Sequence, residues 1–142
     1  MNSPKLNNSE VRAEQVANKK HQTIKLGLDV HADSIVVVRI LDHSAPQPGQ
    51  RFSWAKFREW IKTQLALADA VHSCYEAGPF GYGLHRELVA LGVQNVIVQP
   101  VCLDERHTGV NHDKSDAKEL AQRLDRYVAG NTHALATVRV PT

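Results

Sequence analysis

Four carboxylates stand where the predicted secondary structure could bring them together. Asp29 lies near the end of the first predicted strand, and Glu76 ends the strand after the first long helix. Asp113 and Asp116 are three residues apart at the start of the last predicted helix, so both can point the same way. Carboxylate oxygens bind Mg²⁺, and two such ions about 4 Å apart assist phosphoryl transfer. The sequence therefore predicts an Mg²⁺ site, with Mn²⁺ as a substitute, suited to phosphoryl-transfer chemistry.

Each acid also has a plainer explanation. Asp29 could form a turn, and Glu76 could be a solvated strand end. Acids in the first turn of a helix, such as Asp113 and Asp116, offset the helix dipole or cap the helix. Without metal, four gathered acids would repel one another and some would stay protonated. Only their joint placement favours a metal site.

The elements that position these acids follow from the hydrophobic pattern. Apolar and polar residues alternate over 24–30, which indicates a strand with Asp29 on the face opposite to the leucines. The β-branched run within 34–41 indicates a second strand, paired with the first as a hairpin. Further elements are predicted as a strand over 51–53, a helix over 54–68 capped by Ser53, a strand over 70–77, a helix over 81–91 stopped by Gly92, a strand over 93–98, a helix over 115–129 and a strand over 135–140. This order predicts an α/β fold: a mixed sheet, hairpin followed by βα units, with helices packed on it.

Composition excludes several classes of protein. The 142 residues suit one folded domain over 23–142 after a flexible polar arm over 1–22. The net charge is +2, which is too small to predict a nucleic-acid partner by itself. The sequence has no membrane span or secretory signal, so a cytoplasmic protein is expected. Cys74 and Cys102 form no CxxC motif and are expected to be buried thiols rather than zinc ligands.

Three segments carry a resemblance to a known family. They are GLDVH (27–31), YEAGPFGYGLHRELVALG (75–92) and DKSDAKELAQRL (113–124). Together they resemble the N-terminal DEDD domain of the IS-one-ten group of transposases, which are recombinases of bacterial insertion sequences. That domain has the ribonuclease-H-like (RuvC-like) fold of Holliday-junction resolvases. The resemblance covers about residues 24–142, and it places the acidic tetrad of the family on Asp29, Glu76, Asp113 and Asp116.

The resemblance also implies an activity and partners. It implies Mg²⁺-dependent DNA strand cleavage and exchange in DNA transposition, a guide RNA and a homo-oligomeric full-length protein. Family members have a C-terminal domain with a nucleophilic serine, which this chain is expected to lack. The isolated chain is therefore expected to bind metal and nucleic acid weakly and not to transpose. One departure is Asn111-His112, where the family usually has a basic residue before the third acid.

Other polar residues are candidates for contacts with nucleic acid. His31 should share the face of Asp29, where it could orient a ligand or touch a phosphate, or be an ordinary polar residue. Lys114, Lys118 and Arg123, with Arg126, are predicted on the outer face of the last helix. They could meet backbone phosphates, and a solvated helix face explains them equally well. Phe80 and Tyr82 could stack on bases, although core packing is the simpler interpretation.

Several alternative sites and functions are weaker. His107 and His112 lack a thiolate partner for zinc, and Ser115 is better explained as a helix cap than as a nucleophile. An actin-like ATPase or sugar kinase would need a Gly-Thr phosphate turn after Asp29, where Val-His-Ala stands. A non-catalytic module that binds nucleic acid or a transposase stays open as the second interpretation.

Overall fold

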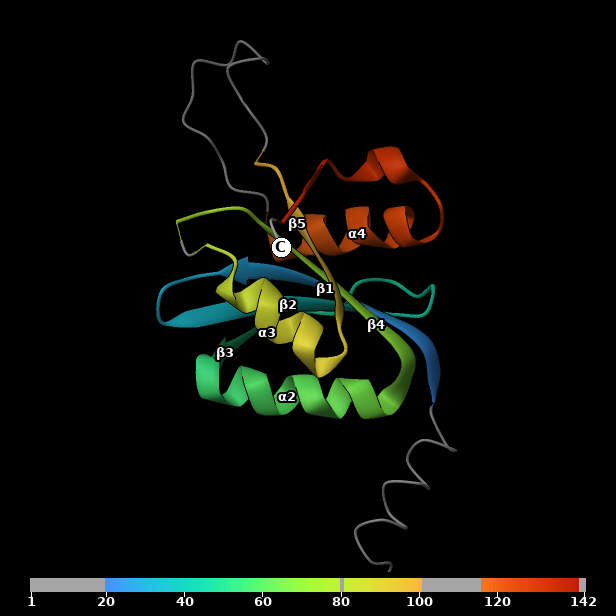
Figure 1. Cartoon of the computed structure of the whole chain (residues 1–142). Coiled ribbons are helices and arrows are strands. Elements are labelled where there is room, and N and C mark those ends of the chain that lie inside the picture. Colours follow the sequence, from blue (N-terminus) through green and yellow to red (C-terminus); the bar gives the residue numbers. More distant parts are fainter. Residues whose placement is uncertain (1–19, 80, 101–115, 141–142) are drawn as a thin grey trace, which may run out of the picture.

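The computed structural model describes residues 20–79, 81–100 and 116–140. In this part of the chain, six strands form one sheet in the order β3-β2-β1-β4-β5-β6. The strands are β1 (His21–Val30), β2 (Ser34–Leu41), β3 (Gln50–Ser53), β4 (Ala68–Glu76), β5 (Gln94–Val98) and β6 (Thr137–Val138). The helices packed on this sheet are α2 (Trp54–Leu67), α3 (Gly83–Leu91) and α4 (Ala117–Val128), and a 3₁₀ turn, η2 (Thr132–Ala134), follows α4 (Figure 1).

The pairing of the strands confirms the predicted α/β mixed sheet. β1 is antiparallel to β2 and parallel to β4, and β4 is parallel to β5. The chain thus forms a hairpin followed by βα units, an arrangement compatible with the ribonuclease-H-like fold. The last strand is shorter than expected, covering only Thr137–Val138.

The first strand begins three residues before its predicted start. The carboxylate of Asp42 accepts hydrogen bonds from the backbone N–H groups of Gln22 (2.7 Å) and Thr23 (3.1 Å) and lies 2.8 Å from Nδ1 of His21. These bonds lower the pKa of Asp42 to about 2, and the bond with His21 makes the largest contribution. The alternation of apolar residues could not reveal this extension, because polar contacts with a distant loop hold it in place.

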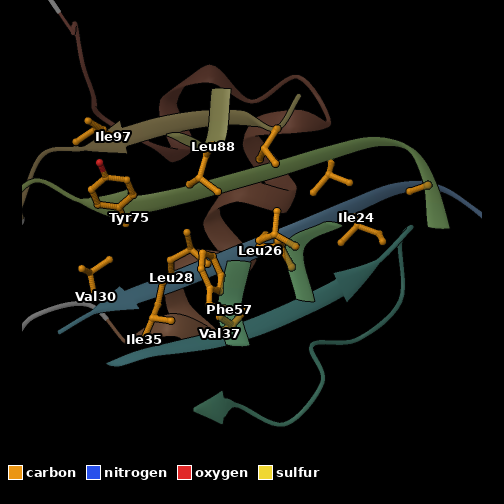
Figure 2. Packing of buried hydrophobic residues seen from close by; sticks show 14 residues of the cluster. Ile24, Leu26, Leu28, Val30, Ile35, Val37, Phe57, Tyr75, Leu88 and Ile97 are labelled. Carbon is orange, nitrogen blue, oxygen red and sulfur yellow. The ribbon is translucent and has the colours of Figure 1, made fainter. Parts of the chain in front are cut away.

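The two faces of the sheet are packed in different ways. Alternate residues of β1, Leu26 and Leu28 among them, join the large apolar cluster beneath α2 and α3, which includes Phe57 and Leu88. Figure 2 shows these side chains gathered on one side of the sheet. The intervening residues Lys25 and Gly27 meet α4, which covers the opposite side of the sheet (Figure 1).

The start of α2 and the end of α3 lie where the sequence predicts them, whereas α3 and α4 each begin two residues later than predicted. The Ser53 side chain caps α2 by accepting a hydrogen bond from the Lys56 N–H at 3.3 Å. Gly92 ends α3 with a left-handed φ of 106°, a conformation that favours glycine. The helices in the described part of the chain are too short or too polar to span a membrane.

The backbone of α4 rests directly on β1. A Cβ atom added to Gly27 would lie 2.1 Å from the carbonyl oxygen of Ala117 and 2.4 Å from the amide nitrogen of Ala121. Ala117 and Ala121 are themselves buried. Small residues on both elements therefore permit an approach that no larger side chain would allow.

An ion pair joins the later part of α4 to a buried lysine in the middle of β1. Lys25 is 1% exposed, and its Nζ lies 3.0 Å from Oδ1 of Asp125 and donates to the backbone carbonyl of Asp42. The side chain of Asp125 is 31% exposed, so water partly screens the pair. Since Asp125 meets Lys25 while Ala117 and Ala121 meet Gly27, α4 runs antiparallel to β1. Its start therefore points toward the end of β1 that carries Asp29.

We expect Gly27→Ala to lower the free energy of unfolding by about 1–3 kcal/mol, the usual cost of overpacking, because the new methyl group meets backbone atoms of α4. Urea denaturation measures this change. Gly49→Ala is the matched control, since its Cβ would lie 3.6 Å from Val36 Cγ1, an ordinary contact. Equal stability of the Gly27→Ala and Gly49→Ala proteins would contradict the close approach.

Candidate metal centre

Asp29 and Glu76 lie at the carboxyl ends of neighbouring parallel strands. The last paired residues of β1 and β4 are Leu28 and Tyr75, so Asp29 and Glu76 are the next positions on each strand. Both alternate with residues of the large apolar cluster, and both therefore face the α4 side of the sheet. Glu76 is 7% exposed, and the side chain of Asp29 is 21% exposed. The structure thus brings two of the four predicted acids together.

Cys74 lies two residues before Glu76 on the same face. Its Sγ lies 3.5 Å from the carbonyl oxygen of Leu120 in α4. Burial raises the pKa of Cys74 to about 12; the charge of Arg123 opposes this shift and that of Glu76 adds to it. Cys74 is therefore a neutral thiol at physiological pH and a poor ligand or nucleophile. The expectation of a buried free thiol is confirmed for Cys74, while Cys102 lies outside the described residues.

Asp116 caps the helix that covers this face. Its Oδ1 accepts a hydrogen bond of 2.7 Å from the N–H of Glu119, so Asp116, rather than Asp113 or Ser115, is the N-cap of α4. Capping occupies one carboxylate oxygen and leaves the second able to bind a cation. The helix starts over Gly27, and the two residues from Gly27 to Asp29 span about 7 Å of strand. Asp116 therefore lies at the same end of the sheet as the two strand acids.

His31 extends this group of polar side chains. Its Nε2 lies 3.1 Å from Oδ2 of Asp29, which confirms that the two side chains share a face. Its backbone N–H donates to the carbonyl of Ser34 at 2.9 Å and closes the turn between β1 and β2. With a side chain that is 41% exposed, His31 can orient the Asp29 carboxylate and still meet a ligand from solvent.

The donors suit a hard cation, since all of the predicted ligands are carboxylates. Among the described residues, however, no three His, Cys, Asp or Glu side chains are grouped closely enough to hold an ion. Asp113, the remaining predicted ligand, lies outside the described residues. The structure therefore shows one pair of neighbouring acids, with Asp116 at the same end of the sheet.

The basic residues predicted on α4 differ in their surroundings. Lys118 is exposed in the first turn, as expected, and Arg126 is exposed near the end of the helix. The placement of Arg123 on the outer face was wrong: its side chain is 21% exposed, and its Nε donates to the carbonyl of Ala134 at 3.1 Å. Arg123 therefore ties α4 to the following turn. Lys114, Ser115, His107 and Asn111-His112 lie outside the described residues.

The sequence also concealed residues that matter for this end of the molecule. Lys25 lies between the apolar residues Ile24 and Leu26 and shares the strand face of Asp29. This position is the one feature of the sequence that indicates a lysine beneath α4. Its partner Asp125 is 100 positions away, and no local pattern connects them. Trp54 and Arg58, which lie near His31, were assigned only to the start of a helix.

Comparison with known proteins adds a family context to this geometry. No protein-family model matches the chain. The chain is 28% identical over 111 residues to the transposase for insertion sequence element IS1533 of Leptospira borgpetersenii, a match covering 75% of this chain and 32% of that protein. It is 38% identical over 71 residues to the putative transposase y4qE of Sinorhizobium fredii, covering 49% of this chain and 18% of that protein. These relatives are named as transposases, and the matched part of the chain spans a third or less of their length.

We expect Asp116→Ala to lower the free energy of unfolding by about 1 kcal/mol, because the first turn of α4 loses its capping acceptor. Asp116→Asn keeps a capping oxygen and should lose less. Urea denaturation in a metal chelator measures both variants without any contribution from bound cations. Asp69→Ala, at the opposite end of β4, is the control. An Asp116→Ala protein as stable as wild type would show that Asp116 does not cap α4 in solution.

Proposed function

We propose that this chain is the metal-binding carboxylate domain of an insertion-sequence transposase. In this proposal, Asp29, Glu76, Asp113 and Asp116 hold Mg²⁺ for the cleavage and exchange of DNA strands in the cytoplasm of a bacterium. The single observation that carries the proposal is the position of Asp29 and Glu76 side by side on parallel strands β1 and β4, facing the helix that Asp116 begins.

The similarity to named transposases supports the choice of DNA as substrate. A paired-acid site could also serve other phosphodiester substrates, because the phosphoryl chemistry is the same. Residues 1–23 hold four of the 17 basic and two of the 15 acidic residues, so the rest of the chain has 13 of each and its charge does not indicate DNA. The relatives therefore supply the substrate class, and the acids supply the chemistry.

Each residue would have a distinct task. Asp29 and Glu76 would act as neighbouring ligands, and Asp116 and Asp113 would approach from the start of α4. His31, bonded to Asp29, would hold that carboxylate in its binding orientation. The bound Mg²⁺ would supply charge stabilisation for the phosphate and lower the pKa of an attacking hydroxyl.

The whole protein would need more than this domain. By its resemblance to the DEDD transposases, we propose that a serine on a second domain completes the active site. A structured guide RNA would select the DNA target, and full-length copies would assemble as homo-oligomers. Lys118 remains a candidate for backbone phosphate contacts, since it is exposed in the first turn of α4.

A titration with Mg²⁺ or Mn²⁺, followed by the rise in melting temperature, tests the metal site. We expect Asp29→Asn, Glu76→Gln and Asp116→Asn each to weaken the apparent affinity at least tenfold. In typical metal sites, loss of a residue that only supports a ligand already lowers the metal affinity by about 10- to 100-fold. Asp69→Asn and Glu59→Gln remove exposed carboxylates elsewhere and should respond like wild type. An equal response in all of these proteins would rule out a shared site.

A second measurement separates a catalytic domain from a non-catalytic binding module. Branched DNA is incubated with the chain and Mn²⁺, and both binding and cleavage are followed. Cleavage that disappears in Glu76→Gln would favour a catalytic domain. Binding without cleavage, with metal affinity intact, would favour the binding module or the need for the second domain. Activation by a nucleoside triphosphate instead of DNA would support the ATPase alternative.

A further inference from the structure

A cavity of about 460 Å³ opens at the same end of the sheet as the candidate metal centre. Its walls come from three places: the turn after β1 with His31, the start of α2 with Trp54 and Arg58, and the start of α3 with Leu84 and Glu87. The volume falls in the range of sites that bind small molecules or single units of a polymer. His31 joins the cavity to the metal centre, because its Nε2 bonds to Asp29 at 3.1 Å.

The indole of Trp54 forms a fixed wall. Its Nε1 donates to the carbonyl of Ala32 at 3.2 Å, and its ring meets the buried Phe57 edge to face, with centroids 6.0 Å apart. The ring is therefore positioned before any ligand arrives. Nucleic-acid bases stack on such aromatic rings without sequence preference, so the wall suits an unpaired base.

Arg58 supplies the positive charge of the cavity. Its guanidinium carbon lies 5.9 Å from the centre of the Trp54 ring, and its Nε bonds to Oε1 of Glu87 at 2.5 Å. The side chain of Arg58 is 48% exposed, and its terminal nitrogens carry further N–H donors for a phosphate. Bases also stack on guanidinium planes. Glu87 opposes phosphate binding, so an incoming phosphate must compete with it for Arg58.

We propose that this cavity binds one unpaired nucleotide of the nucleic-acid substrate, with its base against Trp54 and its phosphate at Arg58. The inference rests on the proposed function and adds the position of the strand next to the metal centre. A base must leave its stack to reach Trp54, and duplex DNA resists this. The cavity therefore favours single strands and branch points over continuous duplex.

A binding experiment with a labelled thymidine oligonucleotide tests the proposal. The oligonucleotide has about ten nucleotides, a usual length for single-strand sites. The full chain is used in a metal chelator, and fluorescence anisotropy is followed over a range of salt concentrations. We expect Arg58→Gln to weaken binding and to reduce the salt slope by about 0.7, the contribution of one phosphate contact on a single strand. Lys62→Gln removes an exposed cation from the same helix, one that also pairs with a glutamate, and should bind like wild type.

Trp54 has its own optical test. The bound oligonucleotide should quench tryptophan fluorescence in the wild type and should not do so in Trp54→Phe, which retains Trp60. Trp54→Leu should weaken binding by about five- to a hundredfold, the usual loss for one stacked base. If Trp54→Leu fails to fold, the quenching comparison with Trp54→Phe still decides the question. Glu87→Gln should tighten binding up to about fivefold, because an exposed ion pair of this strength competes with the phosphate.

Wild-type affinity in Arg58→Gln, or equal quenching in wild type and Trp54→Phe, would overturn the nucleotide cavity. A duplex of the same length that binds more tightly than the single strand would also overturn it. These results can be distinguished from results that would refute the metal site. Arg58→Gln and Trp54→Phe should keep the wild-type melting response to Mg²⁺, whereas an equal metal response in the acid variants would refute only the metal centre.

Discussion

The arrangement of this end of the molecule depends on the direct contact between the backbones of β1 and α4 at Gly27. A single methyl group there would reach within 2.1 Å of the Ala117 carbonyl oxygen, so the helix lies as close to the sheet as the chain allows. The contact of Asp125 with Lys25 then places the later turns of the helix over the earlier part of β1. Because of these two contacts, the start of α4, and with it Asp116, lies at the end of β1 that carries Asp29.

The same geometry gathers complementary charges. The carboxyl ends of β1 and β4 and the starts of α2, α3 and α4 lie at one end of the sheet (Figure 1). Helix starts carry partial positive charge and favour anions, while Asp29 and Glu76 favour cations. This end of the sheet can therefore attract an anion and a cation together, such as a phosphate with its counter-cation. The acids and the cavity lie on different faces of the sheet. The acids face α4, whereas Trp54 and Arg58 lie in the first turns of α2 on the opposite face.

Local patterns in the sequence predicted the strand positions of the acids and several helix boundaries. The alternation in β1 placed Asp29 opposite the leucines, and that in β4 placed Glu76 opposite Val71 and Tyr75. Ser53 and Gly92 marked helix boundaries that the structure confirms. The neighbouring positions of Asp29 and Glu76 required only that β1 and β4 pair. Long-range contacts could not be predicted in this way. The Lys25–Asp125 pair, the bond of Arg123 to Ala134 and the role of Gly27 each join segments that no local pattern connects.

The central claim is that a metal ion binds between the ends of β1 and β4 and the start of α4. Mn²⁺ broadens the NMR signals of nearby amides, so a titration with substoichiometric Mn²⁺ locates the ion directly. The account predicts selective broadening for Leu28–His31, Tyr75–Ala77 and Asp116–Lys118. Signals from Gln22, Asp42 and Asp69, at the opposite end of the sheet, should persist. Broadening centred on those residues, or spread evenly over exposed acids, would contradict the account.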